Sequence, residues 1–139
     1  PGTGRAAIVL PDGILTNSRT GYVRNFVLER FQVLAVVSLP VAAFMHYGTS
    51  VKASVVFVRK LDSDEVSDPD APVFLAEAAS VGYDATGRQA VNQLPQILDE
   101  YRKFVKDPDS YLVELPTFTA VADDAGPAGD ADDLEDDGE

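Results

Sequence analysis

The sequence predicts an α/β fold in which a strand–helix–strand unit is followed by an antiparallel strand. Three short apolar runs, too continuous for strands with one solvated face, indicate buried strands at Ala6–Leu10, Leu34–Leu39 and Ala53–Val58. The first two runs flank an amphipathic segment, Thr20–Phe31, and this order is typical of a parallel pair joined by a right-handed crossover. No helical pattern separates the second and third runs, so these two are expected to pair antiparallel as a wide hairpin.

Residues flanking these runs set the predicted limits of the elements. Pro11-Asp12-Gly13 follows the first run and is typical of a turn. Thr20 is a suitable N-cap for the helix, whose apolar side chains recur at spacings of three and four residues. Pro40 ends the second strand and begins a long loop that reaches Lys52.

The second half of the chain predicts fewer regular elements. Leu61–Pro72 is acidic and contains proline, which indicates an exposed connection. A short strand is expected at Val73–Ala76, a turn-rich stretch at Val81–Arg88 and a helix at Leu94–Phe104. Tyr111–Leu115 is a candidate for one further strand.

Charge is distributed unevenly along the chain, which has 139 residues and a net charge of −12. Residues 1–60 carry seven basic and two acidic side chains, whereas residues 61–122 carry four basic and twelve acidic ones. Residues 123–139 carry nine acidic side chains and no basic one, and their composition predicts a disordered tail. The first segment is therefore the one whose charge could attract nucleic acid.

Composition excludes several kinds of chemistry. The chain has no Cys, which excludes disulfides and thiolate catalysis, and one His, which excludes a multi-histidine metal site. No apolar run reaches the roughly 18 residues of a membrane helix, and no signal peptide or phosphate-binding glycine motif is recognisable. The chain begins with Pro-Gly and without an initiator Met, from which we expect a fragment of a longer protein or a processed product.

The loop between the second and third strands holds the most informative side chains, Phe44, His46, Tyr47 and Lys52. Aromatic side chains on a loop beside basic residues are suited to base stacking, and Lys52 could reach a phosphate. The alternatives are that the aromatics pack on the sheet edge, that His46 is an ordinary polar residue and that Lys52 is solvated. Asp12 follows a strand where α/β sheets contact ligands, or it simply forms the turn.

Specific strings in the first 60 residues resemble one family. Arg5–Leu15 (RAAIVLPDGIL), Gly21–Phe31 (GYVRNFVLERF) and Leu34–Lys60 (LAVVSLPVAAFMHYGTSVKASVVFVRK) are similar to the later part of N6-adenine DNA methyltransferases. They are most similar to the modification subunit of type I restriction-modification systems. Val73–Gly87, which ends in GYDATG, is similar to the region that follows in that family.

The resemblance implies the C-terminal part of a Rossmann-like S-adenosylmethionine-dependent methyltransferase sheet. The first run would be the fifth strand of that sheet, and the next two would form its final antiparallel hairpin. The family's early glycine-rich motif and its Asn-Pro-Pro-aromatic or Asp-Pro-Pro-aromatic motif do not occur in this chain. We therefore expect residues 1–106 to be the C-terminal portion of a methylase domain, followed by a short extension at 107–122 and the tail at 123–139.

The same resemblance assigns roles to the loop. It implies that Phe44 stacks on a flipped adenine, that His46, Tyr47 and Lys52 flank the base or backbone, and that Pro11, Asp12 and Gly13 border the substrate cleft. It also implies S-adenosylmethionine bound mainly by residues outside this chain, DNA, a specificity subunit and a restriction subunit as partners, and a cytoplasmic location. No catalytic residue is expected here. The alternative is a non-catalytic interaction module that binds a partner through Leu94–Leu115.

Overall fold

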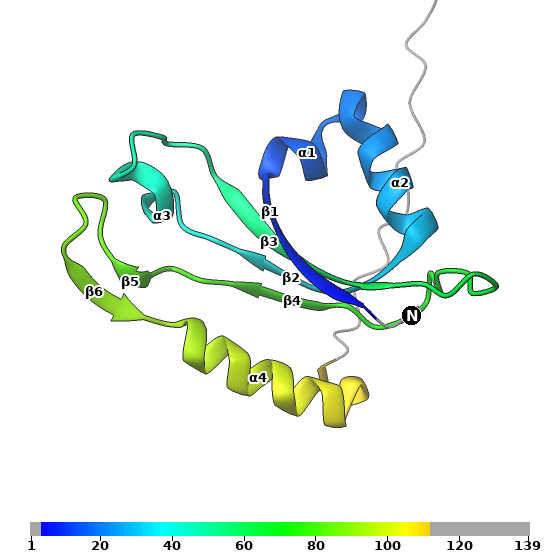
Figure 1. Cartoon of the computed structure of the whole chain (residues 1–139). Helices are drawn as coiled ribbons and strands as arrows, with labels where there is room; N and C mark the ends of the chain where they lie inside the picture. The colour runs from blue at the N-terminus through cyan, green and yellow to red at the C-terminus, as the bar shows by residue number, and fades with distance from the viewer. Residues whose placement is uncertain (1–3, 112–139) are drawn as a thin grey trace, which may run out of the picture.

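The computed structural model describes residues 4–111, which form a twisted four-stranded sheet with helices on both faces and a separate two-stranded hairpin (Figure 1). The sheet contains, in chain order, β1 (Arg5–Pro11), β2 (Phe31–Ser38), β3 (Ala53–Lys60) and β4 (Phe74–Glu77), and the hairpin contains β5 (Val81–Tyr83) and β6 (Gln89–Asn92). The α-helices are α1 (Asp12–Thr16), α2 (Gly21–Arg30), α3 (Ala42–Met45) and α4 (Leu94–Lys106), and short 3₁₀ turns cover Ser18–Thr20 and Pro108–Tyr111.

The order of strands in the sheet is β1-β3-β2-β4. β3 pairs antiparallel with β1 on one side and with β2 on the other, and β2 pairs parallel with β4. The predicted hairpin between β2 and β3 is therefore confirmed. The predicted pairing of β1 with β2 is wrong, because the two strands run in the same direction but β3 lies between them and satisfies the inner edge of each.

β1 is an exposed edge strand, which corrects the expectation that it is buried on both faces. Within the described residues it pairs only with β3, and Val9 is 52% exposed. Burial concentrates instead on the inner strands, where Val58 of β3 is 1% exposed. The continuous apolar sequence of β1 is typical of a buried strand. The other described residues nevertheless leave most of its side chains exposed.

The predicted helices are confirmed with small shifts at their ends. α2 begins after Thr20 as expected, but the Thr20 hydroxyl does not cap it and instead contacts the carbonyl oxygens of Gly13, Ile14 and Asn17. Phe31 begins β2 rather than ending the helix. Asp12 and Gly13 form the first turn of α1 rather than an isolated turn, since Asn17 N–H donates to the Gly13 carbonyl.

The turn-rich stretch at 81–88 folds as the β5–β6 hairpin, whose strands the sequence did not predict. Val73–Ala76 corresponds to β4, shifted by one residue. Of the candidate strand at Tyr111–Leu115, Tyr111 ends a 3₁₀ turn and the other residues lie outside the described range, as does the acidic tail. No helix within residues 4–111 is long and apolar enough to cross a bilayer.

Helices α1 and α2 lie over one face of the sheet and α4 lies along the other (Figure 1). Under α4, Phe74 of β4 packs against Phe104 and Tyr101, with ring centroids 5.4 Å and 5.5 Å apart. Ala35 of β2 completes this cluster, and Val37, Leu39 and Ala43 form a second cluster closer to α3. α4 therefore anchors the β4 side of the sheet.

Replacing Phe104 with alanine is expected to lower the free energy of unfolding by about 3–5 kcal/mol, because the ring is buried among Ala35, Phe74 and Tyr101. Chemical denaturation of the purified protein measures the change. The control is Val66→Ala, which alters a side chain that is 86% exposed and should change stability by less than about 0.5 kcal/mol. Equal effects of the two substitutions would contradict the assigned core.

Candidate functional site

The carboxyl ends of three strands meet at one edge of the sheet. β1, β2 and β4 run in the same direction and end at Pro11, Ser38 and Glu77. α1, α3 and the β5–β6 hairpin follow these strand ends, so they gather at the same edge (Figure 1). Open α/β sheets bind ligands at this edge, because the connecting loops present side chains there while the strands hold them in place.

Four polar side chains from three segments, the start of α1, the start of β3 and the end of β4, meet at this edge. The Ser54 hydroxyl donates to Asp12 Oδ1 at 2.8 Å, and Asp12 N–H donates to the Lys52 carbonyl at 3.0 Å. Lys52 Nζ lies 2.9 Å from Glu77 Oε1. Ser54 is the one buried polar side chain among the described residues, and its contact explains the position of Asp12.

The Lys52–Glu77 pair carries opposite charges at a solvent-accessible position. The hydrogen bond from Lys52 lowers the pKa of the Glu77 carboxyl, and the same bond raises the pKa of the Lys52 ammonium. The Asp12 carboxylate adds a smaller charge contribution in the same direction to the pKa of Lys52. Because water screens exposed pairs strongly, Lys52 can exchange Glu77 for another anion at small cost.

The aromatic residues of the β2–β3 loop occupy different environments. Phe44 is half-buried and packs with Val37, Leu39 and Ala43, as the packing alternative expects. Tyr47 is 73% exposed. His46 is half-buried beside Tyr47, with ring centroids 3.7 Å apart, and its Nδ1 atom is buried without a hydrogen-bond partner among the described residues.

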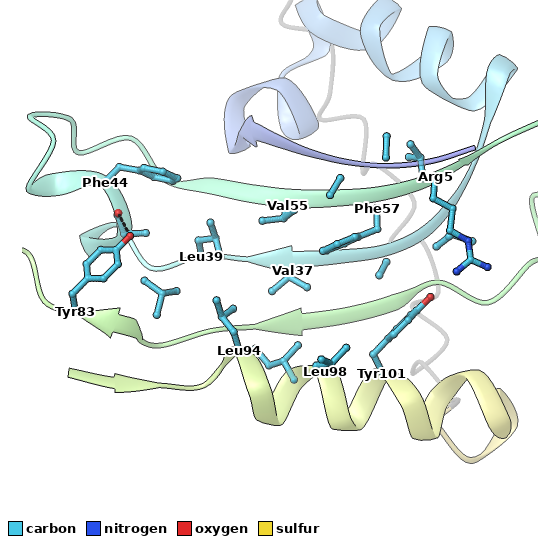
Figure 2. A pocket seen from close by; sticks show the side chains of 18 residues that line it. Arg5, Val37, Leu39, Phe44, Val55, Phe57, Tyr83, Leu94, Leu98 and Tyr101 are labelled. Atoms are coloured by element: carbon cyan, nitrogen blue, oxygen red, sulfur yellow. Dashed lines mark hydrogen bonds between the residues drawn. The ribbon is translucent and has the colours of Figure 1, made fainter. Parts of the chain in front are cut away.

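An apolar groove of about 760 Å³ lies between the sheet and α4 and extends from Arg5 to Phe44 (Figure 2). Val55 and Phe57 of β3 line one side, and Leu94 and Leu98 of α4 line the other. Arg5 is the one charged residue in its lining. This groove can hold apolar side chains, but it has no set of polar groups suited to acid–base chemistry.

The structure therefore brings together some of the residues singled out from sequence. Asp12 and Lys52 belong to one polar cluster, whereas Phe44, His46 and Tyr47 form the aromatic part of the edge. Pro11 and Gly13 have no polar side chain to add to this cluster, and the Gly13 carbonyl accepts instead from Asn17 N–H and the Thr20 hydroxyl. Within residues 4–111, no group of three or more His, Cys, Asp or Glu could hold a metal ion.

Sequence reasoning missed Ser54, Glu77 and Tyr83. Ser54 stands inside an apolar run, Glu77 ends the short β4, and the Tyr83 hydroxyl donates to the Ala43 carbonyl at 3.0 Å. For Ser54, the only sequence signal is that a polar residue stands within an otherwise apolar strand. Glu77 and Tyr83 have no local signal, because their partners lie 25 and 40 residues away in the sequence.

Two of the solved structures that are similar in fold to this chain come from type I restriction-modification systems. A type I restriction-modification complex has 23% sequence identity to this chain and a TM-score of 0.54, covering 80% of this chain and 22% of its own. A modification subunit of a candidate type I restriction enzyme from Vibrio vulnificus YJ016 has 20% identity and a TM-score of 0.51, covering 79% of this chain and 21% of its own. This chain thus spans about a fifth of each of those chains.

A candidate class I S-adenosylmethionine-dependent methyltransferase from Listeria monocytogenes has 17% identity and a TM-score of 0.48, covering 76% of this chain and 28% of its own. Among curated protein sequences there is no significant match. The family model described as N-6 DNA Methylase matches residues 2–124, which is most of the chain. This family match agrees with the mixed sheet of the structure and with the antiparallel hairpin of β2 and β3. On this evidence the chain belongs to the N-6 DNA Methylase family.

Proposed function

We propose that the chain is a segment of a site-specific DNA-methyltransferase (adenine-N6) of a restriction-modification system, which transfers a methyl group from S-adenosylmethionine to adenine in DNA. The observation that carries this proposal is the family match over residues 2–124. The similar folds of type I restriction-modification proteins support the same system. DNA, a specificity subunit and a restriction subunit are the proposed partners, and the cytoplasm is the proposed location.

The described residues do not themselves fit an S-adenosylmethionine site. Ser54 engages the Asp12 carboxylate, and the large groove is apolar. No strand in residues 4–111 is followed by the glycine-rich turn that approaches such a ligand closely. We therefore propose that residues outside this chain bind most of the cofactor and supply the catalytic groups. Residues 1–139 alone should be inactive, and methyl transfer to DNA by the isolated chain would contradict this.

The role proposed for this segment is to contact the target base. An enzyme that modifies a base must first extrude it from the duplex, and an aromatic face can restore part of the lost stacking energy. Phe44 lies at the carboxyl edge of the sheet, in the loop that also carries His46, Tyr47 and Lys52. We propose that Phe44 stacks on the flipped adenine and that the other three contact the base or the adjacent backbone.

Replacing Phe44 with leucine tests this role in the full-length enzyme. Leucine keeps an apolar side chain against Val37 and Leu39 but has no aromatic face. Because base stacking contributes about 1–3 kcal/mol, kcat/KM for methylation should fall roughly 5- to 160-fold. Phe44→Tyr is the matched control and should retain most of the activity. Unchanged kinetics for Phe44→Leu would leave packing as the role of Phe44.

Lys52 is proposed to contact a DNA phosphate in competition with Glu77. The two side chains form an exposed ion pair with 2.9 Å between Nζ and Oε1. Neutralising Glu77 would leave the Lys52 ammonium free to approach a phosphate. The protein would then make one more charge contact with DNA, and that contact would release additional counterions from the DNA. The same ion pair lies beside Asp12, the residue proposed to border the substrate cleft.

The substitution Glu77→Gln is therefore expected to strengthen DNA binding and to steepen its salt dependence by about one unit of log K against log salt. Fluorescence anisotropy over a salt series measures both quantities. Glu100→Gln is a matched control, because Glu100 pairs with Lys103 on α4 through a similar 2.7 Å contact away from this edge. If both substitutions change the slope equally, Lys52 has no specific role.

We also propose that residues 1–106 are the C-terminal portion of a larger methylase domain. β1 has one partner among the described residues, and its side chains are largely exposed although apolar. The adjoining groove exposes Phe57 of β3 and Leu98 of α4. A strand edge with no partner among the described residues, beside an uncovered apolar face, is unfavourable for an isolated protein, which supports coverage by another segment.

Hydrogen exchange should distinguish the two edges of the sheet. In the full-length protein the amides of β1 should exchange more slowly than in the 139-residue chain, because a further strand would pair with them. β4, the opposite edge strand, is the internal control and should change little. Equal exchange of β1 in both proteins, with added protection of α4 by a partner, would favour the alternative of a non-catalytic interaction module.

A further inference from the structure

The segment proposed to contact the base has little structure of its own. α3 contains four residues, and no side chain caps its N-terminus. A single helical turn is unstable in isolation, because the entropy of ordering it exceeds the gain from its few hydrogen bonds. Its position must therefore depend on contacts with other parts of the fold.

The β5–β6 hairpin supplies such a contact through Tyr83. The Tyr83 hydroxyl donates to the main-chain carbonyl of Ala43 at 3.0 Å, across 40 residues of sequence, and Figure 2 shows this bond between the hairpin and α3. Ala43 is buried and immediately precedes Phe44. Carbonyl groups in the last turn of a helix have no partner within the helix, so this bond satisfies an acceptor of α3.

His46 forms the second contact between the two elements. Its ring lies edge-to-face on Tyr83, with centroids 4.6 Å apart, and it also packs on Tyr47. The hairpin turn also lies close to His46, since Gly87 has a φ of +83° and a Cβ placed on it would be 3.7 Å from His46 Cβ. The hairpin therefore lies directly against His46, which follows Phe44 by two residues and immediately precedes Tyr47.

The turn of the hairpin is itself well braced. Asp84 Oδ1 accepts hydrogen bonds from Thr86 N–H at 2.8 Å, from the Thr86 hydroxyl at 2.7 Å and from Arg88 N–H at 3.0 Å. These bonds, with that of the Thr86 hydroxyl first, lower the pKa of the Asp84 carboxyl. A turn held in one conformation by these hydrogen bonds moves little. It can therefore keep a weakly structured neighbour such as α3 in a fixed position.

From these contacts we infer that Tyr83 is a positioning residue for the target base: it touches neither base nor cofactor, but holds α3 so that Phe44 faces the flipped adenine. This inference rests on the proposed base-contacting role of Phe44. It adds that the hairpin, which the sequence shows only as a turn-rich stretch, controls how accurately the flipped base is placed. The reacting atoms are sensitive to such placement, so a hydrogen bond remote from them can affect turnover.

The test is Tyr83→Phe in the full-length enzyme, which keeps the ring against His46 and removes only the hydroxyl. Tyr101→Phe is the matched control, because the Tyr101 hydroxyl forms no hydrogen bond among residues 4–111 while its ring packs on Phe74. DNA carrying 2-aminopurine at the target position reports base extrusion by fluorescence. Single-turnover methylation, KM for DNA and the melting temperature are measured alongside.

Tyr83→Phe is expected to lower the single-turnover rate roughly 2- to 10-fold and to reduce the 2-aminopurine signal, as loss of one neutral hydrogen bond predicts. KM and the melting temperature should stay close to those of Tyr101→Phe. A rate and signal equal to those of the control would overturn the inference, as would a fall in melting temperature with an unchanged signal. A wild-type enzyme without methylation or base extrusion would instead overturn the proposed function on which the inference rests.

Discussion

The antiparallel insertion of β3 between β1 and β2 is the constraint on which the remaining structure depends. β3 satisfies the inner edges of both neighbours, and its Val58 is among the most buried side chains of the described fold. Because β3 runs opposite to its neighbours, the loop that leads into it must lie at their carboxyl ends. That single reversal places Phe44, His46, Tyr47 and Lys52 at the edge where α/β sheets bind ligands.

The two faces of the sheet are covered to different extents, and this difference connects the fold with its proposed context. α1 and α2 cover one face, whereas α4 covers mainly the β4 side of the other (Figure 1). The uncovered part forms the apolar groove, which adjoins β1 at the edge that has no partner strand within the described range. An apolar groove and an apolar strand whose outer edge has no partner within residues 4–111 lie at the same side of the molecule, which is consistent with one further segment covering both.

The candidate site is assembled by weak individual contacts that reinforce one another. Ser54 orients Asp12, the main chain of Asp12 holds the Lys52 backbone, and the Lys52 side chain reaches Glu77. A second set, centred on Tyr83 and His46, supports α3. The polar contacts leave Lys52 free to exchange Glu77 for another anion, such as a phosphate of the proposed DNA partner. The contacts of Tyr83 and His46 limit the movement of α3, which carries Phe44.

Local patterning alone determined the main elements of this protein. Apolar runs predicted β1, β2 and β3, amphipathic spacing predicted α2 and α4, and the sequence motifs indicated the family that the comparison then confirmed. These features follow from residues within a few positions of one another, which is the range over which hydrophobic periodicity operates. The loop that carries Phe44 was also located in this way, although its stacking role stays a prediction.

Only the tertiary structure decided the strand order, the exposure of β1 and the partners of the site residues. The pairing of β3 with β1, the Lys52–Glu77 ion pair and the Tyr83–Ala43 hydrogen bond each join segments at least 25 residues apart. Hydrophobic periodicity does not report such pairings, because a run suited to burial is equally compatible with a central strand or an edge strand. Which segments pack against each other depends on the folded chain as a whole. In this protein that packing determines which side chains lie around the position proposed for the base.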